Sequence, residues 1–134
     1  VPFNLFGAPW IKGEELAEKI NSLNIPGLLC LSKYFIPNYG MYQGEVCSGV
    51  YLICLDREIY RPVTAAIHIL SLLTRDYKDR FEFTSVRSYD QRAGSSRLRE
   101  DLINGRDPID ILAEWNDEAK QFMQDRKPYL LYEE

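Results

Sequence analysis

The chain has 134 residues, a length that fits one domain, and 46% of them are hydrophobic and 27% charged. This balance is typical of a globular domain and excludes a largely disordered chain. The net charge of −4 and the scattered Lys and Arg residues argue against nucleic acid as a partner, and no apolar run approaches the roughly 20 residues of a membrane-spanning helix.

The N-terminal half predicts one helix followed by two strands. Residues 13–23 carry apolar side chains at helical spacing, and Pro26-Gly27 ends that pattern. Residues 28–36 are apolar and aromatic on both faces, which favours an inner strand of a sheet. After a loop rich in Pro, Gly, Asn and Tyr, residues 46–55 predict a second strand whose two faces are also apolar.

The C-terminal half predicts further helices and two short strands. In chain order, we expect a helix at 62–77, a strand at 80–84, a polar loop at 85–94, a helix from 95 or 96 to 104, a helix from 107 to 127 and a strand at 129–132. The buried stripe of the last helix is expected at Leu112, Trp115, Ala119 and Phe122. This order indicates one compact α+β domain in which about four helices pack on a small mixed sheet.

The cysteines and the single histidine do not predict a metal site or a cofactor site. Cys30, Cys47 and Cys54 form no CxxC pair, and one histidine does not complete a zinc set of usual spacing. Buried free thiols are the simpler interpretation. His68 lies on a polar stripe of its predicted helix, which favours the surface or an interface. A Cys47–His68 nucleophile pair is disfavoured, because an apolar strand raises the pKa of a thiol.

Three carboxylates lie where functional sites usually gather. Glu45, Asp56 and Asp90 are at predicted strand ends or in predicted loops, and glycoside hydrolysis needs two carboxylates flanking the sugar bond. Tyrosines near these acids, Tyr42 among them, are typical of sugar-binding surfaces. A structural interpretation stays open for each: Asp56 with Arg57 as a turn and surface ion pair, Asp90 as a turn cap, and the tyrosines as the rim of a core.

Several stretches, taken together and in order, resemble one known family. They read PFNLFGAPWI, GEVCSGVYLICLDR, YRPVTAAIHIL, YDQRAGSSRLREDLINGRDPIDILAEW and RKPYLLY. The set resembles the C-terminal part of the NamZ-type exo-β-N-acetylmuramidases, a bacterial glycoside hydrolase family long catalogued as a domain of unknown function. Within it, Gly44, Glu45, Cys47, Gly49 and Val50 match a Gly-Glu-x-Cys-x-Gly-Val pattern.

The resemblance implies a two-domain protein of the cell wall. Family members release N-acetylmuramic acid from the non-reducing ends of peptidoglycan fragments, with the catalytic acid in an N-terminal Rossmann-like domain and the substrate cleft between the domains. Because the chain starts at Val1, we expect residues 1–134 to be the C-terminal auxiliary domain alone, without a catalytic residue and inactive by itself. We expect the whole protein in the periplasm, in the cell envelope or secreted. The expected substrate contacts are Glu45, Tyr42, Asp56, Arg57 and Asp90.

Two other functions are open at this point. The domain is either a carbohydrate- or peptidoglycan-binding module without chemistry, or a structural domain that buttresses its partner. If residues 1–134 are one domain of a larger protein, we expect an exposed apolar patch where the N-terminal domain docks, and such a patch is also able to drive dimerisation.

Overall fold

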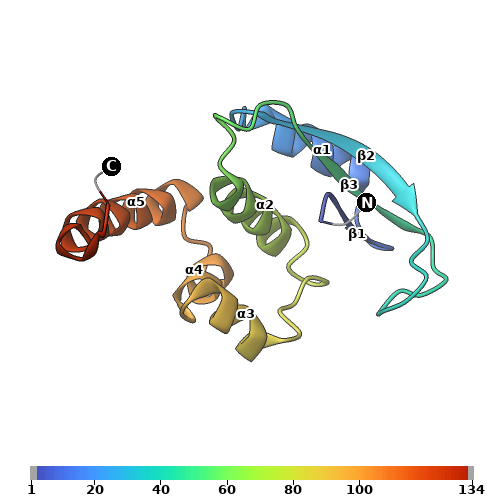
Figure 1. Cartoon of the computed structure of the whole chain (residues 1–134). Helices are drawn as coiled ribbons and strands as arrows, with labels where there is room; N and C mark the ends of the chain where they lie inside the picture. Colours follow the sequence, from blue (N-terminus) through green and yellow to red (C-terminus); the bar gives the residue numbers. More distant parts are fainter. Residues whose placement is uncertain (1–2, 133–134) are drawn as a thin grey trace.

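A computed structural model describes residues 3–132 and shows an α+β domain, as predicted. Its strands are β1 (Leu5–Ala8), β2 (Leu28–Phe35) and β3 (Cys47–Cys54). Its helices are α1 (Gly13–Ser22), α2 (Pro62–Asp76), α3 (Val86–Ala93), α4 (Arg97–Ile103) and α5 (Pro108–Asp125), followed by a 3-10 turn, η1 (Lys127–Tyr129). Figure 1 shows the strands and α1 at one end, α2 in the middle, and α3 to α5 beyond it.

The three strands form one antiparallel sheet in the order β1-β3-β2. The sheet is therefore not mixed, and β2 is an edge strand where an inner strand was predicted. Leu5, Tyr51 and Leu31 are cross-strand neighbours on one face, while Val50 lies on the opposite face within the core. The helix α1 packs along β2 and β3 on that core face, where the backbone N–H of Gly13 donates to Ser48 Oγ at 3.0 Å.

The helix α2 is buried on two sides and joins two hydrophobic clusters. Ile69, Leu72 and Leu73 pack into the first cluster with α1 and the sheet. Ile67 belongs to the second cluster, together with Leu98 and Leu102 of α4 and Ile111 of α5. The two clusters therefore meet through this one helix, which explains why apolar residues lie on two of its sides, next to the polar stripe that carries His68.

The second half of α5 is largely uncovered. Ile111 is fully buried near its start, and Leu112 and Trp115 are partly buried as predicted. Ala119 and Phe122 were predicted in the buried stripe but are exposed, Phe122 by 63%. Figure 1 shows this helix leading away from the rest of the chain, which explains the difference.

Three further sequence predictions were wrong. Residues 80–84 form turns and irregular chain rather than a strand. The predicted polar loop at 85–94 is largely α3, which ends at Gly94 in a left-handed conformation with φ 87°. The predicted strand at 129–132 is replaced by η1 and irregular chain up to residue 132. Conversely, the four-residue strand β1 was missed. Within residues 3–132, no helix combines the length and apolarity that a membrane span needs.

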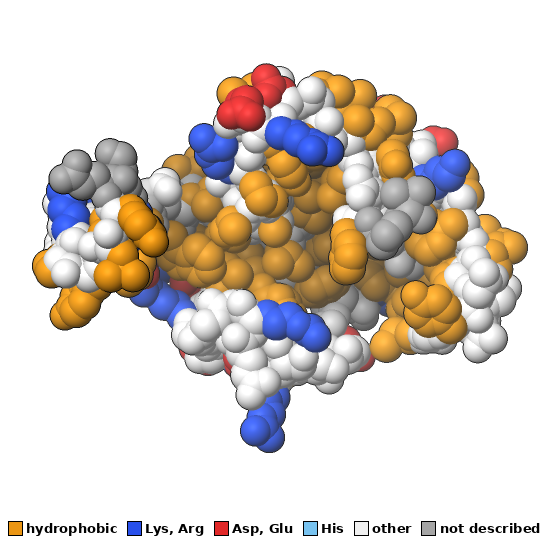
Figure 2. All heavy atoms as spheres, viewed as in Figure 1, with side chains coloured by type: hydrophobic (Ala, Val, Ile, Leu, Met, Phe, Trp, Pro, Cys, Tyr) orange, Lys and Arg blue, Asp and Glu red, His pale blue; other side chains and the backbone are white. Residues whose placement is uncertain are grey.

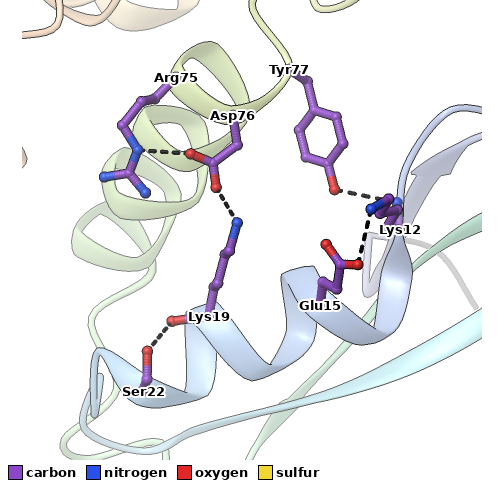
Figure 3. A network of polar contacts seen from close by, with 7 residues as sticks. All are labelled: Lys12, Glu15, Lys19, Ser22, Arg75, Asp76 and Tyr77. Carbon is purple, nitrogen blue, oxygen red and sulfur yellow. Dashed lines mark hydrogen bonds and ion pairs between the residues drawn. The ribbon is translucent and has the colours of Figure 1, made fainter.

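Polar contacts fix α1 against α2 outside the apolar core (Figure 3). Asp76, at the end of α2, accepts from Lys19 Nζ of α1 at 2.8 Å and from Arg75 Nε at 2.7 Å. Its side chain is 17% exposed, and the bond from Arg75, together with Lys19, lowers the pKa of its carboxyl. One residue later, the Tyr77 hydroxyl accepts from the backbone N–H of Lys12 at 3.2 Å. The end of α2 is thus tied to both ends of α1.

We expect Asp76→Asn to lower the free energy of unfolding at neutral pH by about 1 kcal/mol, because the carboxylate accepts two charge-assisted bonds. The pKa of Asp76 is lower in the folded state, so its contribution is complete above the unfolded value of about 3.9 and is lost as the pH falls through the folded value. Urea unfolding from pH 7 down to pH 2 should show the difference between wild type and variant closing at the acid end.

The control for this prediction is Glu15→Gln. Glu15 pairs with Lys12 through side chains that are 57% and 70% exposed. Its removal should change the free energy of unfolding by less than about 0.5 kcal/mol. Equal losses of unfolding free energy in both variants would show that the Lys19–Asp76 contact stabilises the fold no more than an exposed ion pair does.

Candidate functional site

An apolar groove of about 560 Å³ opens between β1 and α2. Its floor includes core residues, among them Ile11, Ile69 and Leu73. Its walls carry larger side chains from segments far apart in the sequence: Phe6, Trp10, Met41, Tyr42, Leu70 and Phe81. Figure 2 shows hydrophobic side chains gathered in a hollow across the middle of this face. The groove is where the first hydrophobic cluster reaches the surface.

Aromatic side chains contact one another at one wall of the groove. Trp10 donates from Nε1 to the Tyr42 hydroxyl at 2.9 Å, although the two residues are 32 positions apart. The Trp10 ring also packs on Tyr77, with 5.4 Å between ring centroids. These contacts attach the loop between β2 and β3 to the turn after β1. The position of Tyr42 is therefore set by tertiary contacts and not by its loop alone.

Of the five predicted substrate contacts, two lie on the same loop. Tyr42 lines the groove, and Glu45 follows it in a turn in which its backbone N–H donates to the Tyr42 carbonyl at 3.1 Å. Gly44, at φ +79°, allows the chain to reverse here, and its N–H donates to the Pro37 carbonyl at 3.0 Å. Glu45 is exposed at the entrance of β3. The loop thus carries a tyrosine and an exposed carboxylate three positions apart in the sequence.

The other three predicted contacts lie elsewhere. Asp56 and Arg57 follow the far end of β3, and the eight residues of this strand span roughly 25 Å. Asp56 accepts from the backbone N–H of Glu58 at 2.9 Å, as expected of a turn-forming aspartate. Asp90 is on α3. The structure therefore does not bring these three residues to Tyr42 and Glu45.

Asp90 has a structural partner within the domain. Both of its carboxylate oxygens accept from Arg99 of α4, at 2.9 and 2.8 Å. This bidentate pair lowers the pKa of the Asp90 carboxyl and links two short helices. Helix α3 buries none of its own residues completely, but Tyr89 and Ala93 pack against the second cluster, and the ion pair adds a polar connection to α4.

Most of the Gly-Glu-x-Cys-x-Gly-Val pattern also has a structural role. Cys47 and Val50 are fully buried, and burial raises the pKa of the Cys47 thiol. Gly49 lies against β1, where a Cβ atom would overlap the carbonyl oxygen of Phe6. Glu45 alone in this pattern directs a polar side chain to solvent. A buried, unreactive Cys47 also gives no support to a Cys47–His68 nucleophile pair.

The remaining thiols and the histidine do not form a second site. Cys30 is buried, which raises the pKa of its thiol to about 11, while Cys54 is exposed. His68 is partly buried, and this burial lowers its pKa against the opposing effect of the Asp107 charge. Within the described part of the chain, no group of three or more His, Cys, Asp and Glu side chains is placed to hold a metal ion.

The groove has the chemistry of a contact surface rather than of a hydrolytic centre. Glu82 is the one acid in its lining among the described residues, with Arg80 close by in sequence on the same wall. Glycoside hydrolysis needs two carboxyl groups on either side of the scissile bond, and this lining does not supply the pair.

The comparisons with known proteins identify the family. Residues 1–132 match the model described as exo-beta-N-acetylmuramidase NamZ, C-terminal. The chain belongs to the NamZ C-terminal family. It is 36% identical over 131 residues to the peptidoglycan beta-N-acetylmuramidase NamZ of Bacillus subtilis strain 168, covering 98% of this chain and 32% of that protein. The chain thus spans about a third of the length of this relative.

A solved structure supports the fold of this NamZ C-terminal domain. The crystal structure of a DUF1343 family protein from Bacteroides fragilis matches with a TM-score of 0.85 at 24% sequence identity. The match covers 98% of this chain and 36% of that one. The arrangement of helices and strands described above is therefore that of a known domain.

Several groove residues were missed by the sequence analysis. Trp10, Phe81 and Arg80 all lie in turns or irregular chain, where no periodicity marks a buried or lining side chain. Trp10 falls within PFNLFGAPWI, one of the stretches that carry the family resemblance, so that motif was the available signal.

We expect Gly49→Ala to lower the free energy of unfolding by about 3 kcal/mol or more, because the added methyl group has no space against the β1 backbone. Thermal unfolding followed by circular dichroism measures the effect. Ser32→Ala, at an exposed position on β2, is the control and should change stability by less than about 0.5 kcal/mol. A Gly49→Ala variant as stable as wild type would contradict this prediction, because it would mean that β1 shifts away from β3 without cost.

Proposed function

We propose that this chain is the C-terminal domain of a peptidoglycan-processing exo-β-N-acetylmuramidase and that it contributes one wall of a substrate cleft. The family match over residues 1–132 carries the proposal. The name of the Bacillus relative, a peptidoglycan beta-N-acetylmuramidase, supports the substrate class. In this proposal the remainder of the protein is a Rossmann-like N-terminal domain that holds the catalytic acid.

The residues proposed to contact the sugar are Tyr42 and Glu45. Both are on the loop between β2 and β3: Tyr42 lines the groove and is held by Trp10, and Glu45 follows three positions later with an exposed side chain. A tyrosine ring offers a flat apolar surface to a sugar, and a carboxylate accepts bonds from sugar hydroxyls. Asp56, Arg57 and Asp90 stay outside the proposed contact because they lie on other parts of the domain.

The proposal also implies a cellular location for the protein. Peptidoglycan fragments occur in the cell envelope, so we propose a periplasmic, envelope-bound or secreted protein. No metal or cofactor enters the proposed mechanism, since acid catalysis by carboxyl groups suffices for glycoside hydrolysis. The rival functions, a sugar-binding module without chemistry and a purely structural domain, are distinguished by the two measurements below.

The first measurement compares turnover of a chromogenic N-acetylmuramic acid glycoside by residues 1–134 and by the complete protein. We expect release of the chromophore by the complete protein and none by residues 1–134, whose groove lacks a carboxylate pair. Turnover by residues 1–134 would place the catalytic acid within this domain. A complete protein without activity that still binds the sugar would favour the binding-module alternative.

The second measurement tests the loop. In the complete protein, Glu45→Gln should lower kcat/KM on the same glycoside about tenfold, because a charge-assisted bond to the sugar becomes a neutral one. Glu45 is exposed, so the melting temperature should not change. Glu58→Gln, an exposed acid beyond the far end of β3, is the matched control and should retain full activity. Equal kcat/KM values for both variants would remove Glu45 from the site.

A further inference from the structure

The apolar groove is poorly suited to a sugar ring. Its floor and walls are largely aliphatic and aromatic side chains, including Phe6, Leu70 and Phe81. Sugar hydroxyls that enter such a lining lose hydrogen bonds to water without gaining partners, which opposes binding. The polar groups suited to a sugar, Tyr42 and Glu45, lie on the loop at its edge. The groove and the proposed sugar contact therefore meet at Tyr42, while Glu45 is not part of the groove lining.

The groove instead continues into the interior of the domain. Ala8, Ile11 and Ile69 belong to the first hydrophobic cluster and also line the groove. Met41, at its mouth, is 68% exposed, and Ala66 of α2 is exposed on the opposite wall. An apolar hollow that continues into a core is typical of a surface that another part of a protein covers. Arg80 and Glu82 on one wall add one charge of each sign for a polar rim.

We propose that this groove is the docking surface for the part of the polypeptide that lies outside the domain in complete members of the family. The domain spans only 32% of the Bacillus relative and 36% of the Bacteroides chain, so about two-thirds of such a protein lies outside it. Interfaces between domains of one chain commonly bury roughly 600–1,500 Å². An apolar segment seated in the groove would cover partly exposed side chains such as Phe6, Leu70 and Phe81 and bring the rest of the protein beside Tyr42. The inference rests on the proposed function for the identity of that partner.

The decisive experiment measures the accessibility of groove positions by thiol labelling. Cys54 is the exposed native cysteine, whereas Cys30 and Cys47 are buried, so Cys54→Ser provides an unreactive background. Ala66→Cys and Met41→Cys place one thiol on each wall of the groove. Ile109→Cys, at a 66% exposed apolar position on α5 outside this groove, is the matched control. Each variant is reacted with a maleimide in residues 1–134 and in the complete protein.

We expect both groove thiols to react at least about tenfold more slowly in the complete protein than in residues 1–134, and the thiol at position 109 to react equally in both. Equal rates at positions 66 and 41 would overturn the proposal. Protection that appears in residues 1–134 alone as its concentration rises would assign the groove to a second copy, and protection there by added N-acetylmuramic acid would assign it to the sugar. Both results would also overturn it.

The labelling result is independent of catalysis. A protected groove in a complete protein that cleaves no muramic acid glycoside would leave the docking surface in place and contradict the proposed function. Cleavage by a complete protein with an unprotected groove would contradict the docking surface only.

Discussion

The two-sided burial of α2 is the constraint on which the rest of this domain depends. One side of the helix completes the cluster under the sheet, through Ile69 and Leu73, and the other side completes the cluster of α4 and α5, through Ile67. Neither half of the chain is large enough to bury its apolar residues without this shared wall. The groove is a direct consequence, because a helix that serves two clusters does not fully cover the sheet on the β1 side.

The fold was predictable where periodicity is strong. Helices α1 and α2 and strands β2 and β3 were found from their apolar patterns, and α5 from its Asp107 cap, which accepts from Ile109 N at 2.8 Å. Residues 80–84 were misread because Phe81 and Phe83 alternate as in a strand. The alternation is real but has another cause: Phe81 packs in one cluster and Phe83 in the other, with 5.1 Å between their rings.

The site was less predictable than the fold. Sequence reasoning predicted Tyr42 and Glu45 from the association of tyrosines with acids in a loop, and it grouped them with Asp90, whose carboxylate is engaged by Arg99. Nothing local in the sequence shows that Arg99, nine positions later, binds the Asp90 carboxylate. Likewise, Trp10 and Tyr42 meet only through the tertiary fold, so their hydrogen bond has no signal in the order of residues. A surface that is built from turns far apart in the sequence can be recognised only in the three-dimensional structure.

The side chain of Asn21, at the end of α1, bonds to the outer edge of β2. Its Oδ1 accepts from the Cys30 N–H and its Nδ2 donates to the Cys30 carbonyl, both at 2.9 Å. These are the main-chain groups that an incoming strand would need at this position. The asparagine amide thus imitates a neighbouring peptide unit and occupies one position near the start of this open edge. Addition of a strand in register along β2 is therefore obstructed at Cys30.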